Sequence, residues 1–218
     1  MVGIGAIYKA LQGVLESAIE IMYNIFGNYG LAIIGITILI KLVLLPLTLK
    51  QDKSMSAMKK LQPKLEALKE KYKNDAQTLN QKTIELYKIH KVNPASGCLP
   101  ILLQMPILFA LFGVLRKTGA DGGVVAEGSK FLWLTLSQPD PFYLLPLLNG
   151  AVSYFQQKLM SASQGSSNPQ MKMMTYMFPI MMIFISYKMP SGLQLYWFVS
   201  SLASVAQQYY IMSRRDEA

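Results

Sequence analysis

Long apolar runs, separated by short polar segments, are the main pattern along this chain. Several approach the roughly 20 residues that a helix needs to cross about 30 Å of hydrocarbon. The pattern therefore predicts five transmembrane helices, at residues 29–49, 97–116, 141–160, 172–189 and 193–212. The fourth is short because Lys172 and Lys188 enclose its apolar residues, and we expect the bilayer to thin around it.

Two segments outside these runs show helical periodicity. In residues 1–28, apolar positions such as Leu11 and Leu15 recur opposite polar ones, which predicts an amphipathic helix on the outer membrane surface. In residues 50–96, two apolar stripes are separated by Asn74 and Asp75, whose side chains suit turns and helix caps. We expect an antiparallel two-helix hairpin there.

Composition and charge agree with an all-α integral membrane protein. The 218 residues are 52% hydrophobic and 15% charged, with a net charge of +9. Between Lys50 and Lys91 there are eleven lysines against five acidic residues, so the positive-inside rule predicts a cytoplasmic hairpin. The N-terminus is then outside and the C-terminus cytoplasmic. The connections are an external loop at 117–140, a cytoplasmic loop at 161–171, an external turn at 190–192 and a cytoplasmic tail at 213–218.

Single residues of reactive type exclude several kinds of site. Cys98 is the one cysteine, which excludes a disulfide within the chain and a multi-cysteine metal site. His90 is the one histidine, and in its lysine-rich segment we expect it to be solvated. No signal peptide is legible at the start, so we expect a protein that lacks one or a mature or trimmed form.

Lys41 is the unusual residue of the first apolar run. A lysine at the membrane centre costs roughly 3 kcal/mol on insertion scales. Its position eight residues before Leu49 is about 12 Å from the cytoplasmic end of the span, too far for its stem to hydrate the amine fully. Lys41 therefore needs a polar environment inside the membrane.

Polar residues at helical spacing mark other spans as well. Each could simply join two helices, which is worth about 0.6 kcal/mol. Aligned polarity in four spans, together with a buried cation, favours a water-accessible groove instead. These residues are Thr37, Lys41 and Thr48 in the first span, Gln104 in the second, Asn149, Ser153 and Gln156 in the third, and Gln194, Trp197, Ser201, Ser204 and Gln208 in the fifth.

The spans contain no Asp or Glu, which argues against proton- or sodium-coupled transport. The sequence also has no nucleophile with a positioned base and no phosphate-binding glycine loop. We therefore expect neither an enzyme nor a bound cofactor or metal. The partner of Lys41 would be water, a lipid phosphate or an acidic polypeptide.

Five stretches, in this order and spacing, resemble the YidC/Oxa/Alb family of membrane protein insertases from Tyr29 to Met212. They are YGLAIIGITILIKLVLLPLTLKQDKSM, LQPKLEALKEKYKND, LYKIHKVNPASGCLPILLQMPILFALF, SYFQQKLM and MPSGLQLYWFVS. The resemblance implies the compact bacterial form, with five transmembrane helices around a hydrophilic groove, an outer amphipathic helix and a cytoplasmic helical hairpin.

The resemblance also implies where the substrate groove lies. Family members generally have an arginine at the position of Lys41, so the charge is kept while the bidentate fork of arginine is lost. Gln156 and Trp197 match further groove positions of the family. Thr37, Gln104, Ser153 and Ser201 join the expected groove because they share helix faces with these residues.

The implied function is membrane protein insertion in the bacterial cell membrane without ATP. Hydrophilic flanks of single- or double-span substrates would enter the positively charged groove, and their apolar segments would leave sideways into lipid. The expected partners are nascent membrane proteins and the bilayer, with the ribosome and the Sec translocon as candidates at the Lys50–Lys91 hairpin and no DNA. A small-solute transporter or channel, or an assembly scaffold for membrane proteins, are the alternatives.

Overall fold

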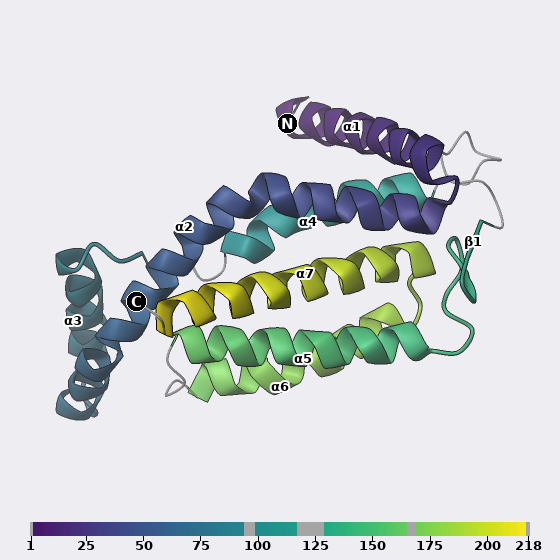
Figure 1. The fold of residues 1–218 in the computed structure, drawn as a ribbon. Coiled ribbons are helices and arrows are strands. Elements are labelled where there is room, and N and C mark those ends of the chain that lie inside the picture. Colours follow the sequence, from purple (N-terminus) through teal and green to yellow (C-terminus); the bar gives the residue numbers. More distant parts are fainter. Residues whose placement is uncertain (1, 94–98, 117–128, 165–168, 217–218) are drawn as a thin grey trace.

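Helices form almost all of the computed structural model, which describes residues 2–93, 99–116, 129–164 and 169–216 (Figure 1). In chain order the elements are α1 (Val2–Phe26), α2 (Tyr29–Lys71), α3 (Ala76–Ile89), α4 (Leu99–Arg116), β1 (Lys130–Phe131), β2 (Leu134–Thr135), α5 (Leu144–Gln164), α6 (Pro169–Ser186) and α7 (Ser191–Asp216). The two strands pair antiparallel, so the expected all-α fold carries one short β-hairpin.

The helices form a bundle in which α7 lies between α2 and α5. On one side α1 packs against α2 and α4, and on the other α5 packs against α6. The β-hairpin lies at one end of the bundle, and α3 lies across the other end (Figure 1). We take the β-hairpin end as the outer end and the α3 end as the cytoplasmic end, following the charge pattern of the sequence.

The apolar core is concentrated at the outer end. Its fully buried members reach Ile36 on α2, run from Leu193 to Tyr196 on α7 and include the last two turns of α4. Ile40, Phe198 and Val199 are partly buried against them. Buried apolar side chains described nearer the cytoplasmic end, such as Met55 and Leu61, are not part of this cluster. The outer end is therefore closed by packed side chains.

Helix α2 begins at an ordinary N-cap and runs far beyond its expected end. Asn28 accepts hydrogen bonds from the backbone amides of Gly30 and Leu31, and the chain turns before it at Gly27, which has a φ of 66°. Gly30 lies within the first turn of α2, where its missing side chain leaves room for the ring of Phe131.

The expected boundary between a span at 29–49 and a hairpin starting at 50 is not a helix end. Helix α2 continues to Lys71, since no glycine or proline lies between Thr48 and Leu61. Pro46 and Pro63 lie inside α2, and Figure 1 shows that the helix changes direction along its length.

Helix α1 packs against two other helices, which its amphipathic pattern did not predict. We expected it on the outer membrane surface, but it packs on α2 and α4 and buries Leu15 and Ile19 in the common core. Glycines permit the close approach: a Cβ on Gly113 would lie 2.9 Å from the hydroxyl of Tyr8. Contact with the membrane through the exposed side of α1 stays a prediction.

The segment before α5 fastens the outer ends of several helices together. The carboxylate of Asp140, buried at 1% exposure, accepts hydrogen bonds from Trp133 Nε1 (3.1 Å), the Phe142 amide (3.0 Å) and the Leu145 amide (2.6 Å). The hydroxyl of Ser191 donates to the Gln138 carbonyl at 2.6 Å. Because Asp140 holds the chain in a turn, α5 begins at Leu144 rather than at the expected residue 141.

Helix α3 and the end of α2 contact each other in the segment where the two-helix hairpin was expected. Asp75 caps α3 by accepting a hydrogen bond from the Thr78 amide at 3.0 Å. Near the other end of α3, Lys64 Nζ lies 3.0 Å from Nε2 of the exposed His90. Cys98 lies outside the described residues, as do 117–128 of the external loop and 165–168 of the cytoplasmic loop.

Length and hydropathy do not confirm all five expected spans. Among the described residues, α2 alone is both long and apolar enough to cross a membrane, with a mean hydropathy of 2.5. Two shorter apolar helices cover Leu102–Leu115 and Thr175–Ser186. The polar residues that α5 and α7 carry lower their hydropathy, and those residues compose the candidate site.

Candidate functional site

The amine of Lys41 lies at the interface of α2 and α7. Its Nζ donates a hydrogen bond to Ser204 Oγ at 2.8 Å, and the Ser204 hydroxyl donates in turn to the Ser200 carbonyl at 3.0 Å. The Lys41 side chain is half-buried, so it is neither fully enclosed nor fully exposed. No carboxylate in the described part of the chain pairs with it. The cation thus has a polar but neutral partner.

Thr37, one turn before Lys41, does not join this contact. Its hydroxyl donates to the Ile33 carbonyl of the same helix at 2.6 Å, and its side chain is buried at 1% exposure. Such a bond satisfies the hydroxyl within α2. Thr37 therefore marks the boundary between the apolar core and the polar region.

Helix α4 reaches α7 through Gln104. The Gln104 amide donates a hydrogen bond to the hydroxyl of Tyr196, which is almost completely buried. The sequence pattern did not single out Tyr196, because a tyrosine in an apolar run is typical of packing. A buried tyrosine hydroxyl generally needs a polar partner, and that need was the available signal.

The interface of α5 and α7 contains buried polar atoms without partners. Asn149 Nδ2 donates to the Gln194 carbonyl at 3.2 Å, and Gln194 Nε2 donates to the Met189 carbonyl at 2.7 Å. Four other atoms have no hydrogen-bond partner among the described residues: Asn149 Oδ1, Gln194 Oε1, Ser153 Oγ and Trp197 Nε1. Buried polar atoms are nearly always bonded to protein or water, so this interface is expected to take up water or a polar guest.

Gln156 and Ser201 lie farther along α5 and α7 from the unpartnered Ser153 and Trp197. Gln156 on α5 is half-buried and Ser201 on α7 is buried. Neither side chain has a hydrogen-bond partner within the described ranges. Of the expected groove residues on other helices, Lys41 and Gln104 bond to α7, whereas Thr37 bonds within α2.

Helix α7 organises the polar region. It bonds to α2 through Ser204, to α4 through Tyr196 and to α5 through the Gln194 carbonyl. Asn149, Gln194 and Ser204 belong to the polar stripes of the sequence, but the expected groove did not include them. The polar contacts begin among the core residues of α7, at Gln194 and Tyr196, and continue toward the cytoplasmic end at Ser204.

The described residues contain no group of three or more His, Cys, Asp or Glu side chains that could hold a metal ion. The arrangement can instead donate and accept hydrogen bonds and present one positive charge within an apolar bundle. These properties define a class of helical membrane protein with a hydrophilic interior.

Comparison with known proteins gives the family. The family model described as 60Kd inner membrane protein matches residues 21–218. The membrane protein insertase YidC of Fusobacterium nucleatum is 62% identical over 208 residues, which are 95% of this chain and 98% of that protein. The membrane protein insertase MisCA of Bacillus subtilis is 46% identical over 188 residues, 84% of this chain and 70% of that one.

A solved structure agrees with these relatives. The crystal structure of an active YidC insertase with its first transmembrane domain resolved has a TM-score of 0.72 and 30% identity. The match covers 93% of this chain and 46% of that one. The chain belongs to the YidC/Oxa family of membrane protein insertases.

Proposed function

We propose that this membrane insertase holds the hydrophilic flank of a substrate in the polar region around α7, while the apolar segment of the substrate enters lipid sideways. The observation that carries the proposal is Lys41, a half-buried cation whose hydrogen-bond partner is the neutral Ser204. A hydroxyl offers partial solvation but no opposite charge. Lys41 thus keeps its capacity to attract an acidic group.

The position of the apolar core gives the polar region its direction. The core closes the outer end, whereas Lys41 and Ser204 lie beyond it toward the cytoplasmic end. A groove around them would open to the cytosol and to lipid and be closed to the outside. A substrate flank would enter from the cytosol.

The unpartnered atoms at α5 and α7 would replace part of the hydration that the flank loses. Asn149 Oδ1 and Gln194 Oε1 are free to accept hydrogen bonds, and Trp197 Nε1 is free to donate one. A buried peptide group without partners costs several kcal/mol in hydrocarbon, so each replacement bond lowers the barrier. A mixed set of donors and acceptors suits flanks of many sequences.

Helix α6 offers the complementary apolar surface. Its outward side chains are flexible or aromatic and are more than 40% exposed: Met173, Tyr176, Met177, Ile180, Met181 and Phe184. Methionine-rich surfaces adapt to partners of different shape. The apolar segment of a substrate would pass along this surface into the bilayer.

Two energy sources replace ATP. Burial of apolar surface in lipid contributes about 25 cal/mol per Å². For an acidic flank moving outward, the membrane potential contributes about 2.3 kcal/mol per charge per 100 mV. Release into the membrane is then downhill.

The proposal includes a membrane topology, substrates and partners for the chain. The chain crosses the bacterial inner membrane five times, with the N-terminus outside and the C-terminus in the cytoplasm. Its substrates are nascent membrane proteins, and the lysines between Lys50 and Lys91 are candidate contacts for a ribosome or the Sec translocon. Among the groove residues, Trp197 and Gln156 are expected to lie nearest the substrate.

Photocrosslinking tests this function. A photoreactive residue replacing Gln156 or Trp197 should capture a nascent single-span membrane protein, whereas the same residue at the exposed Leu202 of α7 should capture mainly lipid. Failure to capture nascent chains, combined with saturable flux of a small solute in proteoliposomes, would show a transporter. Capture limited to completed, already inserted proteins would show an assembly scaffold.

A further inference from the structure

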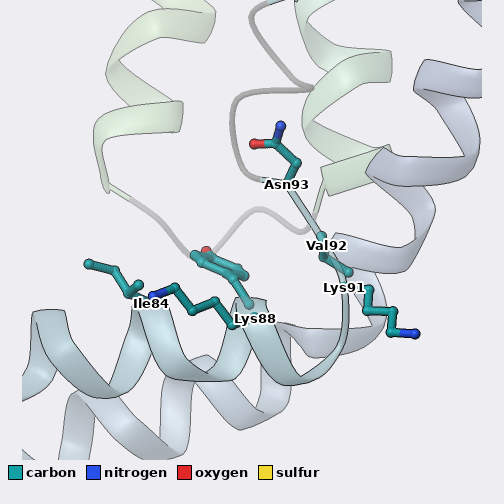
Figure 2. Close-up of a pocket in the computed structure, with 6 residues that line it drawn as sticks. Ile84, Lys88, Lys91, Val92 and Asn93 are labelled. Carbon is teal, nitrogen blue, oxygen red and sulfur yellow. The ribbon is translucent and has the colours of Figure 1, made fainter.

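One face of α3 combines lysines with exposed apolar side chains. Ile84, Tyr87, Lys88 and Lys91, here called the α3 basic face, line an open cavity of about 350 Å³ together with Val92 and Asn93 (Figure 2). Ile84 and Lys88 are one helical turn apart and share one side of α3, and Lys91 follows just after the helix ends at Ile89. The apolar side chain of Ile84 is 54% exposed, so its own hairpin leaves it largely uncovered.

The charge of this face is not neutralised. Within the described ranges, neither Lys88 nor Lys91 has an ion-pair partner. Glu85, the one acidic residue in the sequence of α3, pairs instead with Lys82 at 2.8 Å. Lys82 lies on the opposite side of the helix from Ile84.

The orientation of α3 directs this face toward the membrane. Helix α3 lies across the cytoplasmic end of the bundle instead of extending along the bundle axis (Figure 1). Ile84 and Lys88 lie on the side of α3 that faces the ends of the bundle helices (Figure 2). A helix in this position runs roughly along the plane of the cytoplasmic leaflet.

We propose that the α3 basic face binds the headgroups of anionic phospholipids in the cytoplasmic leaflet. Lys88 and Lys91 attract the phosphates, while Ile84 and Tyr87 enter the boundary between headgroups and acyl chains. Basic residues beside apolar ones are the pattern of helices that lie in a membrane interface. RNA would also attract the lysines but would gain nothing from an exposed isoleucine.

The bound lipid would fix the hairpin against the bilayer. Because α3 is joined to α2, which carries Lys41, the lipid contact would hold the long cytoplasmic part of α2 in one position. The inference goes beyond insertion itself and does not require the groove mechanism. It needs the bundle to lie in a membrane.

Headgroup quenching in nanodiscs tests the proposal. In a Cys98→Ser background, a fluorophore is attached to a cysteine at Asn80, an exposed position one turn before Ile84 on the same side. Lipids spin-labelled at the headgroup should quench it at least two-fold more strongly in discs with phosphatidylglycerol than in discs of phosphatidylcholine alone. The double variant Lys88→Gln and Lys91→Gln should lose this difference.

Further variants distinguish an effect of the α3 basic face on quenching from an effect of the overall charge of α3. Lys88→Arg with Lys91→Arg should retain the quenching, and Lys82→Gln should retain it although it also removes a positive charge from α3. Equal quenching in both kinds of disc, or equal loss in Lys82→Gln, would overturn the proposal. So would loss of quenching on adding a short RNA or inorganic phosphate at constant ionic strength, because either result would show a different ligand.

Discussion

Lys41 on α2 donates a 2.8 Å hydrogen bond to Ser204 on α7, two residues that are 163 positions apart in the chain. The contact joins the one lysine of the first apolar run to a helix that also bonds to α4 and α5. If this bond served only to hold helices together, an isosteric neutral residue could replace the lysine. Substitutions of Lys41 and of Ser204, made one at a time, are therefore expected to affect insertion differently.

Ser204→Ala removes the neutral partner and leaves the charge. Hydrogen bonds between membrane helices are worth about 0.6 kcal/mol, so we expect insertion of a single-span substrate to fall by no more than about three-fold. An insertion assay in proteoliposomes measures the effect. Loss of insertion as large as that caused by removing the lysine charge would show that the contact is structural.

Asp140→Asn tests the fastening at the outer end. Asparagine has one side-chain oxygen, so it cannot accept the hydrogen bonds from Trp133, Phe142 and Leu145 that the carboxylate divides between its two oxygens. We expect a loss of about 2 kcal/mol in the free energy of unfolding, measured by thermal denaturation in detergent. Trp133→Phe removes one of the three donors and should cost clearly less; equal effects would contradict the carboxylate's central role.

Gly113→Leu tests the packing of α1 on α4. A side chain at Gly113 would collide with Tyr8 and Gln12, and we expect a destabilisation of about 1–3 kcal/mol. Gly13→Leu is the control, because a Cβ there meets no atom within 4 Å. Equal unfolding temperatures for the two variants would show that α1 does not stay packed on the bundle.

Asp75 makes the stability of α3 depend on pH. Hydrogen bonds from the side chain and backbone amide of Thr78 lower the pKa of Asp75. A lowered pKa in the folded state means that the stabilisation is present above the unfolded value, about 3.9, and is lost as the pH falls through the folded value. The protection of the amides of residues 76–89 against hydrogen exchange, relative to an unfolded chain at the same pH, should then decrease at low pH. Asp75→Asn caps the helix without titrating, so the amide protection of α3 in this variant should not change over the pH range in which Asp75 is protonated.

Local chemistry made parts of the fold predictable from the sequence. The caps at Asn28 and Asp75 are visible because capping depends on one side chain and the amides that follow it. The continuity of the first span with the first hairpin helix was not visible, because Lys50 and Asp52 change the polarity of the chain but not its helical propensity. Polarity and helix ends are separate properties.

Long-range packing explains what the sequence could not show. The contact of α1 with α4 joins Tyr8 to the Phe109 carbonyl, 101 positions away, and rests on glycines that have no periodic signal. In the candidate site, the spacing of Lys41, Ser153 and Trp197 predicted the polar stripes. It could not reveal that Tyr196 bonds to Gln104 or which polar atoms stay without partners.

The proposed mechanism depends on the positive charge of Lys41, and substitutions at this position measure what that charge contributes. Lys41→Ala, Lys41→Gln and Lys41→Arg should be compared in an insertion assay that uses a single-span protein with an acidic external tail and a matched protein with a neutral tail. We expect Arg to retain insertion, and both Ala and Gln to reduce insertion of the acidic substrate at least ten-fold while sparing the neutral one. Insertion of the acidic substrate by Lys41→Ala at the wild-type rate would contradict the electrostatic role of Lys41.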